Sequence, residues 1–187
     1  MGILTPNFDK HLSLSTGLSP QQARDRLEAA AEWLPAMPEV RPRRVSYRLT
    51  FFLMLDLPPS QKPLYAARED GVMRVTRRPG PWRTSYQPIA DVSCNGHPEG
   101  TRVELALKVP KKSVMMTRAT GVLALGFSAL VAIVFPLPEV SIGVALVGVL
   151  VALVNRLSAG AMHRREVAAL KEVLEEALRL DPRLESK

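Results

Sequence analysis

The residues best suited to metal chemistry are one cysteine and three histidines. Cys94 and His97 have the spacing of half a zinc site, but no second pair of ligands follows them. The Asn-Gly pair between them is typical of a hairpin turn. His11 and His163 lie far away along the chain, so we expect no metal centre and no bound cofactor.

Residues arranged for catalysis are also missing from the sequence. Carboxylates such as Asp91, Glu99 and Glu104 are scattered over predicted strands and turns, and their spacing pairs none of them for acid and base roles. The sequence contains no glycine-rich phosphate loop and no nucleophile elbow. We therefore expect a protein that is not an enzyme.

The best candidate for a binding surface is a set of cationic and aromatic side chains. If they share a face, they could bind lipid phosphate or an acidic partner, and nucleic acid is the least favoured ligand. The alternative is a solvated strand edge that charge protects from aggregation. The predicted partner or lipid contacts are Arg74, Arg77, Arg78, Trp82, Arg83, Tyr86, Lys111, Lys112 and Arg118.

The element that dominates the chain is an apolar run over residues 119–154. No charged side chain occurs within 119–135 or within 140–154, and Pro136 and Pro138 between these blocks oppose a continuous helix. A helix needs about 20 apolar residues to cross a bilayer. We therefore predict a transmembrane helical hairpin within residues 113–157, whose second arm reaches a spanning length only if it extends to its last three residues.

Lysine and arginine residues flank this run, whereas the turn contains none. By the positive-inside rule, the asymmetry predicts a two-pass protein of the bacterial inner membrane with both termini in the cytoplasm. The net charge of +7 fits a head close to anionic lipid, and the single cysteine fits a reducing compartment. Because neither residues 119–138 nor residues 140–154 include an ionisable side chain, we expect no channel or transporter.

Small residues recur along both arms at steps of three and four positions, which allows two helices to approach closely. One interpretation is that these residues pair the two arms with each other. The other is that one face docks the transmembrane helix of a partner. The predicted helix-packing residues are Ala124, Ser128, Ala132, Ala145, Gly148 and Ala152.

The segment before the hairpin predicts an α+β head over residues 19–112, preceded by an extended arm over residues 1–18. A capping box at Ser19 and Gln22 should begin a helix that ends at Pro35. We then expect an antiparallel sheet of about five strands, with an Asp-Gly turn in one hairpin. The predicted strands cover residues 45–57, 64–68, 72–77, 84–94 and 101–109.

The last segment, residues 158–187, is predicted to form an amphipathic cytoplasmic helix. Three surfaces could cover its apolar stripe: the sheet of the head, a second chain in a short coiled coil, or lipid. The residues of the stripe are Val167, Leu170, Leu174, Ala177 and Leu178.

The order of these features is similar to that of a group of bacterial proteins. The stretch WRTSYQPI at residues 82–89 precedes a strand at residues 100–108, and the two-helix hairpin follows directly. This arrangement resembles small inner-membrane proteins that have a β-rich cytoplasmic head and a transmembrane hairpin. The resemblance implies the architecture alone, because the group has no assigned activity.

From these patterns we expect a non-catalytic accessory or scaffolding subunit of a larger inner-membrane complex, whether respiratory, photosynthetic or for transport. Its expected partners are other membrane-protein subunits and anionic lipid, not nucleic acid. The alternative is a lipid-binding or membrane-organising homo-oligomer that acts alone. An enzyme that handles a lipid substrate would need a deep polar pocket in the head, and no sequence feature marks one.

Overall fold

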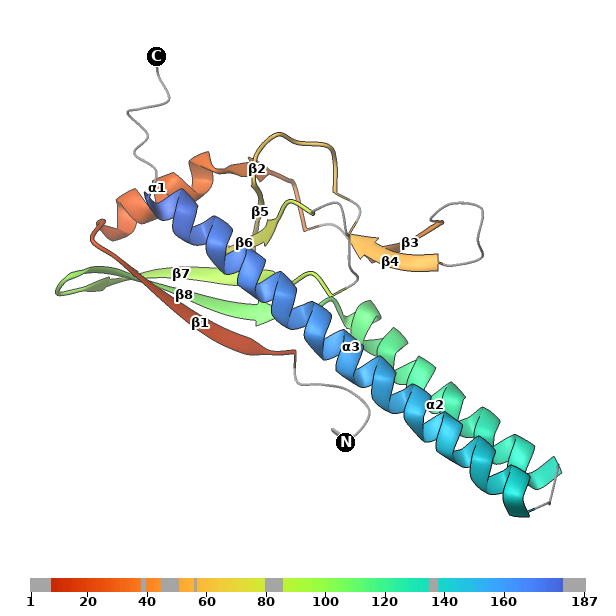
Figure 1. Ribbon diagram of the computed structural model, residues 1–187. Helices are drawn as coiled ribbons and strands as arrows, with labels where there is room; N and C mark the ends of the chain where they lie inside the picture. The colour runs from red at the N-terminus through yellow and green to blue at the C-terminus, as the bar shows by residue number, and fades with distance from the viewer. Residues whose placement is uncertain are drawn as a thin grey trace.

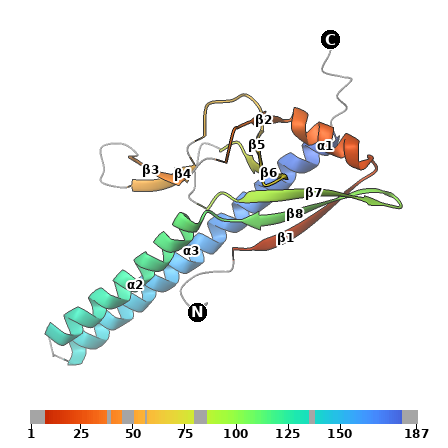
Figure 2. The ribbon, with the colours of Figure 1, turned by 180° about the vertical axis from the view of Figure 1, so that it is seen from behind.

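The computed structural model describes residues 8–37, 40–44, 51–55, 57–79, 86–134 and 138–179. These residues form a head, made of a β-sheet with helices against one face, and a long helical hairpin that projects away from it (Figures 1 and 2). The base of the hairpin lies beside the head, and its tip is the part of the molecule farthest from the sheet (Figure 1).

The head contains a mixed sheet and a separate ribbon. The strands of the main sheet have the order β1-β8-β7-β6-β5-β2; neighbours are antiparallel except β2 and β5, which are parallel. Among the described strands, β3 and β4 pair with each other outside this sheet. In chain order the elements are β1 (Lys10–Thr16), α1 (Pro20–Ala29), β2 (Ala31–Trp33), β3 (Val40–Arg44), β4 (Phe51–Leu55), β5 (Leu64–Glu69), β6 (Val72–Arg77), β7 (Ile89–His97), β8 (Gly100–Lys108), α2 (Lys111–Val134) and α3 (Pro138–Arg179).

The α+β class is confirmed, but the expected details of the head are partly wrong. The sheet has six strands and is mixed, and a strand precedes the first helix. The arm predicted over residues 1–18 contains β1, which pairs antiparallel with β8 at the sheet edge. Leu12 and Leu14 of β1 both pack toward the core, which fits the two-residue period of a strand. Of the strand predicted over residues 45–57, the part at 45–50 and residue 56 lie outside the described residues.

The capping box and the Asp-Gly turn form as the sequence predicts. The Ser19 hydroxyl accepts a hydrogen bond from the Gln22 amide at 3.3 Å, and the Gln22 side chain accepts one from the Ser19 amide at 3.0 Å. The helix nevertheless ends at Ala29, before Pro35, because the chain enters strand β2. Between β5 and β6, Asp70 and Gly71 both have positive φ, at 54° and 77°, as a tight hairpin turn requires.

The turn between β7 and β8 lies farther along the chain than the Asn-Gly pair suggests. β7 continues to His97, which pairs with Gly100 across the turn. Gly100 has a φ of 135°, and a Cβ atom there would overlap the backbone of Thr16 in β1. This glycine therefore permits the edge strand to approach the hairpin.

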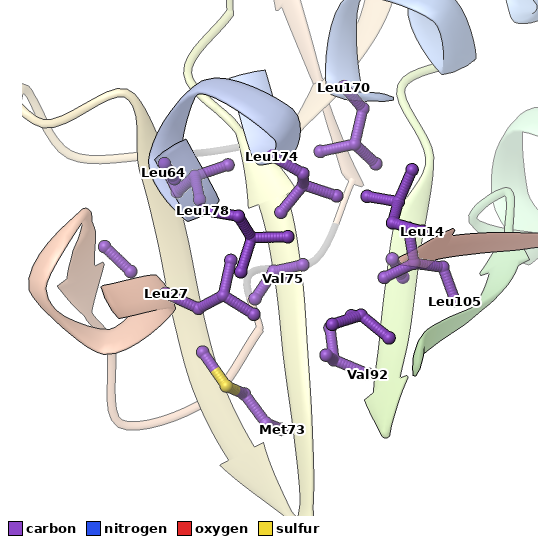
Figure 3. Packing of buried hydrophobic residues seen from close by; sticks show 14 of the residues in the cluster. Leu14, Leu27, Leu64, Met73, Val75, Val92, Leu105, Leu170, Leu174 and Leu178 are labelled. Carbon is purple, nitrogen blue, oxygen red and sulfur yellow. The ribbon is translucent and has the colours of Figure 1, made fainter. Parts of the chain in front are cut away.

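Two helices cover the same face of the sheet. Figure 3 shows Leu27 of α1 beside Leu178 of α3, in one cluster with Leu174 of α3 and Leu64 and Val75 of the sheet. All five side chains are buried. All five residues of the predicted C-terminal stripe are buried in this cluster, so the stripe packs on the sheet. The helix predicted over residues 158–187 is, as far as residue 179, the C-terminal part of α3, which is one helix that continues from the hairpin into the head. The apolar stripe of α3 is covered by α1 and the sheet, and α3 extends to them as one unbroken helix.

Candidate functional site

The outer surface of the hairpin is apolar and exposed. α2 and α3 are both long and apolar enough to cross a membrane. Many large apolar side chains of these two helices are exposed, including Leu123 and Ile133 on α2 and Leu146 on α3. A surface of this size and composition is stable when lipid or another apolar surface covers it.

The two helices of the hairpin are in close contact at a glycine. A Cβ atom added at Gly148 would overlap the side chain of Ser128 and would lie 3.1 Å from the Ala124 carbonyl oxygen. The Ser128 hydroxyl donates a hydrogen bond to that same carbonyl oxygen at 2.9 Å. Of the six predicted helix-packing residues, Ser128 and Gly148 are buried, Ala124, Ala132 and Ala152 are half-buried, and Ala145 is exposed.

A chain of polar side chains connects the hairpin to the head. The Asn155 side chain of α3 donates a hydrogen bond to the Thr117 carbonyl oxygen of α2 at 3.1 Å. The Thr117 hydroxyl donates to the Ser113 carbonyl oxygen at 3.0 Å, so the Tyr86 hydroxyl, 2.8 Å away, is the donor to Thr117. These bonds place Thr117 and Asn155 at the same level of the hairpin.

Aromatic rings pack against one another in the same region. Phe8 stacks on Tyr86 with ring centres 5.7 Å apart and meets His163 of α3 edge-on at 5.2 Å. Nδ1 of His163 lies 3.4 Å from the Tyr86 carbonyl oxygen. We call Phe8, Tyr86, Ser113, Thr117, Asn155 and His163 the junction cluster.

The junction cluster contains two buried polar atoms that are unpaired. Among the described residues, Nε2 of His163 and Oγ of Ser113 have no hydrogen-bond partner, and both side chains are at most 2% exposed. Burial lowers the pKa of His163, against an opposing contribution from the Tyr86 carbonyl. Burial therefore favours the neutral form of the imidazole.

A buried ion pair lies on the head side of this cluster. Nε and Nη2 of Arg77 on β6 lie 2.8 Å and 2.6 Å from the same carboxylate oxygen of Glu166 on α3. Both residues lie where the long helix crosses the sheet. The pair therefore connects strand β6 directly to the helix that forms the hairpin.

The structure disperses the predicted cationic surface. Arg74 pairs with Glu69 and Asp91 on the open face of the sheet, whereas Arg77 points to the helices, because residues three apart on a strand have opposite orientations. Arg78 is exposed, and Tyr86 belongs to the junction cluster. Lys111, Lys112 and Arg118 are exposed at the base of the hairpin. Trp82 and Arg83 lie outside the described residues.

The half zinc site is not assembled either. Cys94 is half-buried toward the core, where burial raises its pKa, whereas His97 is exposed on the opposite side of the same strand. Within the described ranges, no three His, Cys, Asp or Glu side chains lie close enough together to hold a metal ion.

Several residues of the junction cluster were not predicted as functional from the sequence. Thr117 and Asn155 are polar positions at the two ends of the apolar run, and their equal distance from the turn is the one signal that pairs them. Phe8 carries no signal, because its partners are more than 75 positions away along the chain.

No protein-family model, no curated protein and no solved structure matches the chain. Its function is therefore inferred from the chemistry and geometry of the described residues.

Proposed function

We propose that the chain is a two-pass protein of the bacterial inner membrane, with its head and both termini in the cytoplasm. We further propose that it acts as a non-catalytic accessory or scaffolding subunit of a larger membrane complex. The observation that carries this proposal is the continuity of α3: one helix of 42 residues is exposed and apolar in its first half and has its apolar stripe buried against the head in its second half.

The length of the hairpin supports insertion into a bilayer. Ser113 and Ala159 are buried at the base of the hairpin, close to the level of the Thr117–Asn155 hydrogen bond. From Ser113 to Val134, α2 rises about 31 Å at 1.5 Å per residue, which matches a hydrocarbon core of about 30 Å. The junction cluster would then lie at the boundary between lipid and cytoplasm.

The rigid connection supports a scaffolding role. Because α3 has no break, a partner bound to the membrane part of the hairpin and a partner bound to the head would be held at a constant distance and orientation. The Arg77–Glu166 ion pair and the buried leucines of α3 oppose rotation of the head about the helix. A flexible linker would not transmit position in this way.

Topology can be tested with single cysteines. In a Cys94→Ser background, Ser13→Cys introduces a thiol on the exposed face of β1, and Glu139→Cys introduces one beside the hairpin tip. A membrane-impermeant maleimide should label Glu139→Cys in intact spheroplasts. It should label Ser13→Cys only after the spheroplasts are lysed. Extraction of the wild-type chain by alkaline carbonate without detergent would refute membrane insertion.

The scaffolding role has a separate test. Solubilised in mild detergent from its native membrane, the protein should migrate well above its own mass of 20.6 kDa together with other membrane subunits. A pure monomer or homodimer would contradict the accessory role. It would favour the second candidate, a lipid-binding homo-oligomer, which the exposed lysines at the base of the hairpin support.

A further inference from the structure

Arg118 lies inside the apolar surface of the hairpin, and the half-buried Arg156 follows Asn155 on the facing helix at a similar level. Arg118 of α2 is exposed, and its neighbours on the same helix face, Met115 and Val122, are 64% and 55% exposed. Arg118 directly follows Thr117, whose hydrogen bond to Asn155 sets the level of the two helices. From Ser113 to Arg118 the helix rises about 7 Å, so the Arg118 backbone would lie about 7 Å inside the apolar band.

The two helices of the hairpin contain few acidic residues near this arginine. α2 contains no acidic residue, and α3 contains none between Glu139 near the tip and Glu166. Glu166 is buried and paired with Arg77, so it does not face Arg118 as a free carboxylate. Lys111, Arg164 and Arg165 are exposed on the cytoplasmic side of the same region. The described charges on the hairpin helices at this level are therefore basic, and Asp9 lies near His163 on the head side of the same region.

We propose that Arg118 binds the phosphodiester of an anionic phospholipid in the cytoplasmic leaflet. A guanidinium group inside hydrocarbon is costly, but its long side chain can extend to the headgroup layer and keep its charge there. The strong acceptors in that layer are phosphate oxygens, which the planar guanidinium binds through two parallel hydrogen bonds. The basic groups nearby favour a lipid with net negative charge over a zwitterionic one. This inference rests on the proposed insertion of the hairpin.

The test compares lipid retention by the full-length protein after purification in mild detergent. Native mass spectrometry would count phosphatidylglycerol molecules retained by the wild type, Arg118→Leu, Arg118→Lys and a control, Arg102→Leu. Arg102 is exposed on β8 in the head, so its substitution removes the same charge away from the hairpin. Arg118→Leu is expected to bind phosphatidylglycerol about fivefold more weakly than the wild type does. This is the change in affinity that corresponds to about 1 kcal/mol for one basic residue near an anionic lipid surface. Arg118→Lys should lose less, and Arg102→Leu should bind as the wild type does.

Three results would overturn the inference while leaving membrane insertion intact. They are equal retention by Arg118→Leu and wild type, equal retention of phosphatidylcholine, and displacement of the lipid by inorganic phosphate at equal concentration. The thermal unfolding of each variant, measured in the same detergent, separates lost binding from lost folding. Extraction of the wild type by carbonate would instead refute the proposed function itself.

Discussion

Arg77 and Glu166 form an ion pair that is almost completely buried, with side-chain exposures of 15% and 4%. One residue belongs to the sheet and the other to the helix that continues into the hairpin. The pair therefore lies at the mechanical connection between the two parts of the molecule. Its burial also determines how it should respond to substitution.

Removal of one partner of this pair should be strongly destabilising. Glu166→Ala leaves the Arg77 guanidinium buried without its counter-charge, which costs about 3 kcal/mol or more. Denaturant unfolding of the detergent-solubilised protein measures this loss. The double variant Arg77→Met/Glu166→Leu should recover much of the stability, because it removes both charges and keeps apolar volume. Lys171→Ala is the control, since the Lys171–Glu175 pair is exposed and should contribute little.

The helix contact in the hairpin should reject a single methyl group. Gly148→Ala places a Cβ atom on the Ser128 side chain and forces the helices apart, at a cost of about 1–3 kcal/mol. Gly143→Ala is the matched control, because no atom lies within 4 Å of a Cβ atom at that position. The first substitution should therefore lower the thermal unfolding temperature, and the second should leave it unchanged. Equal unfolding temperatures would show that the helices do not meet at Gly148.

The stability of the junction cluster should depend on pH. The pKa of His163 is lowered from its ordinary value of 6.5 by burial, so the folded state favours the neutral imidazole. Its contribution to stability is complete above pH 6.5 and is lost as the pH falls from 6.5 toward the lower pKa of the folded state. Of the neighbouring charges, Asp9 opposes this shift of the His163 pKa and Lys10 supports it.

The measurement is the unfolding temperature from about pH 8 to about pH 5. Wild type should lose stability on acidification, and His163→Phe should lose less, because its ring cannot be protonated. His97→Gln serves as a control at an exposed histidine. If the unfolding temperatures of the wild type and His163→Phe fell equally with pH, the pH dependence could not be assigned to His163.

The edge strand should be released by a substitution at the β7–β8 turn. Gly100→Val cannot adopt the φ of 135° without strain, and its side chain would displace the Thr16 backbone. Hydrogen exchange of the β1 amides, residues 10–16, should then accelerate relative to those of β5. Gly96→Ala is the control, since its nearest neighbour would be Pro20 Cγ at 3.8 Å. Unchanged protection of β1 in Gly100→Val would show that this glycine is not required for the edge pairing.

The cationic surface expected from the sequence shows why residue type alone is a poor guide to exposure. Arg74 and Arg77 are equally basic and three positions apart, but one lies among carboxylates on the open face and the other is buried against α3. Their partners, Asp91 and Glu166, are brought to them by strand pairing and helix docking. Neither partner can be identified by spacing along the chain.

The sequence by itself determined the features that depend on near neighbours: the capping box at Ser19, the Asp-Gly turn, the two uncharged segments of the hairpin and the apolar stripe of the last helix. Each of these follows from a backbone preference or a hydrophobic period within a few turns of chain. The tertiary structure alone decided that β1 lies at the sheet edge, that α3 continues into the head, and that His163 is buried. These outcomes depend on contacts between segments as many as 155 positions apart, such as Phe8 with His163, and such contacts leave no local pattern in the sequence.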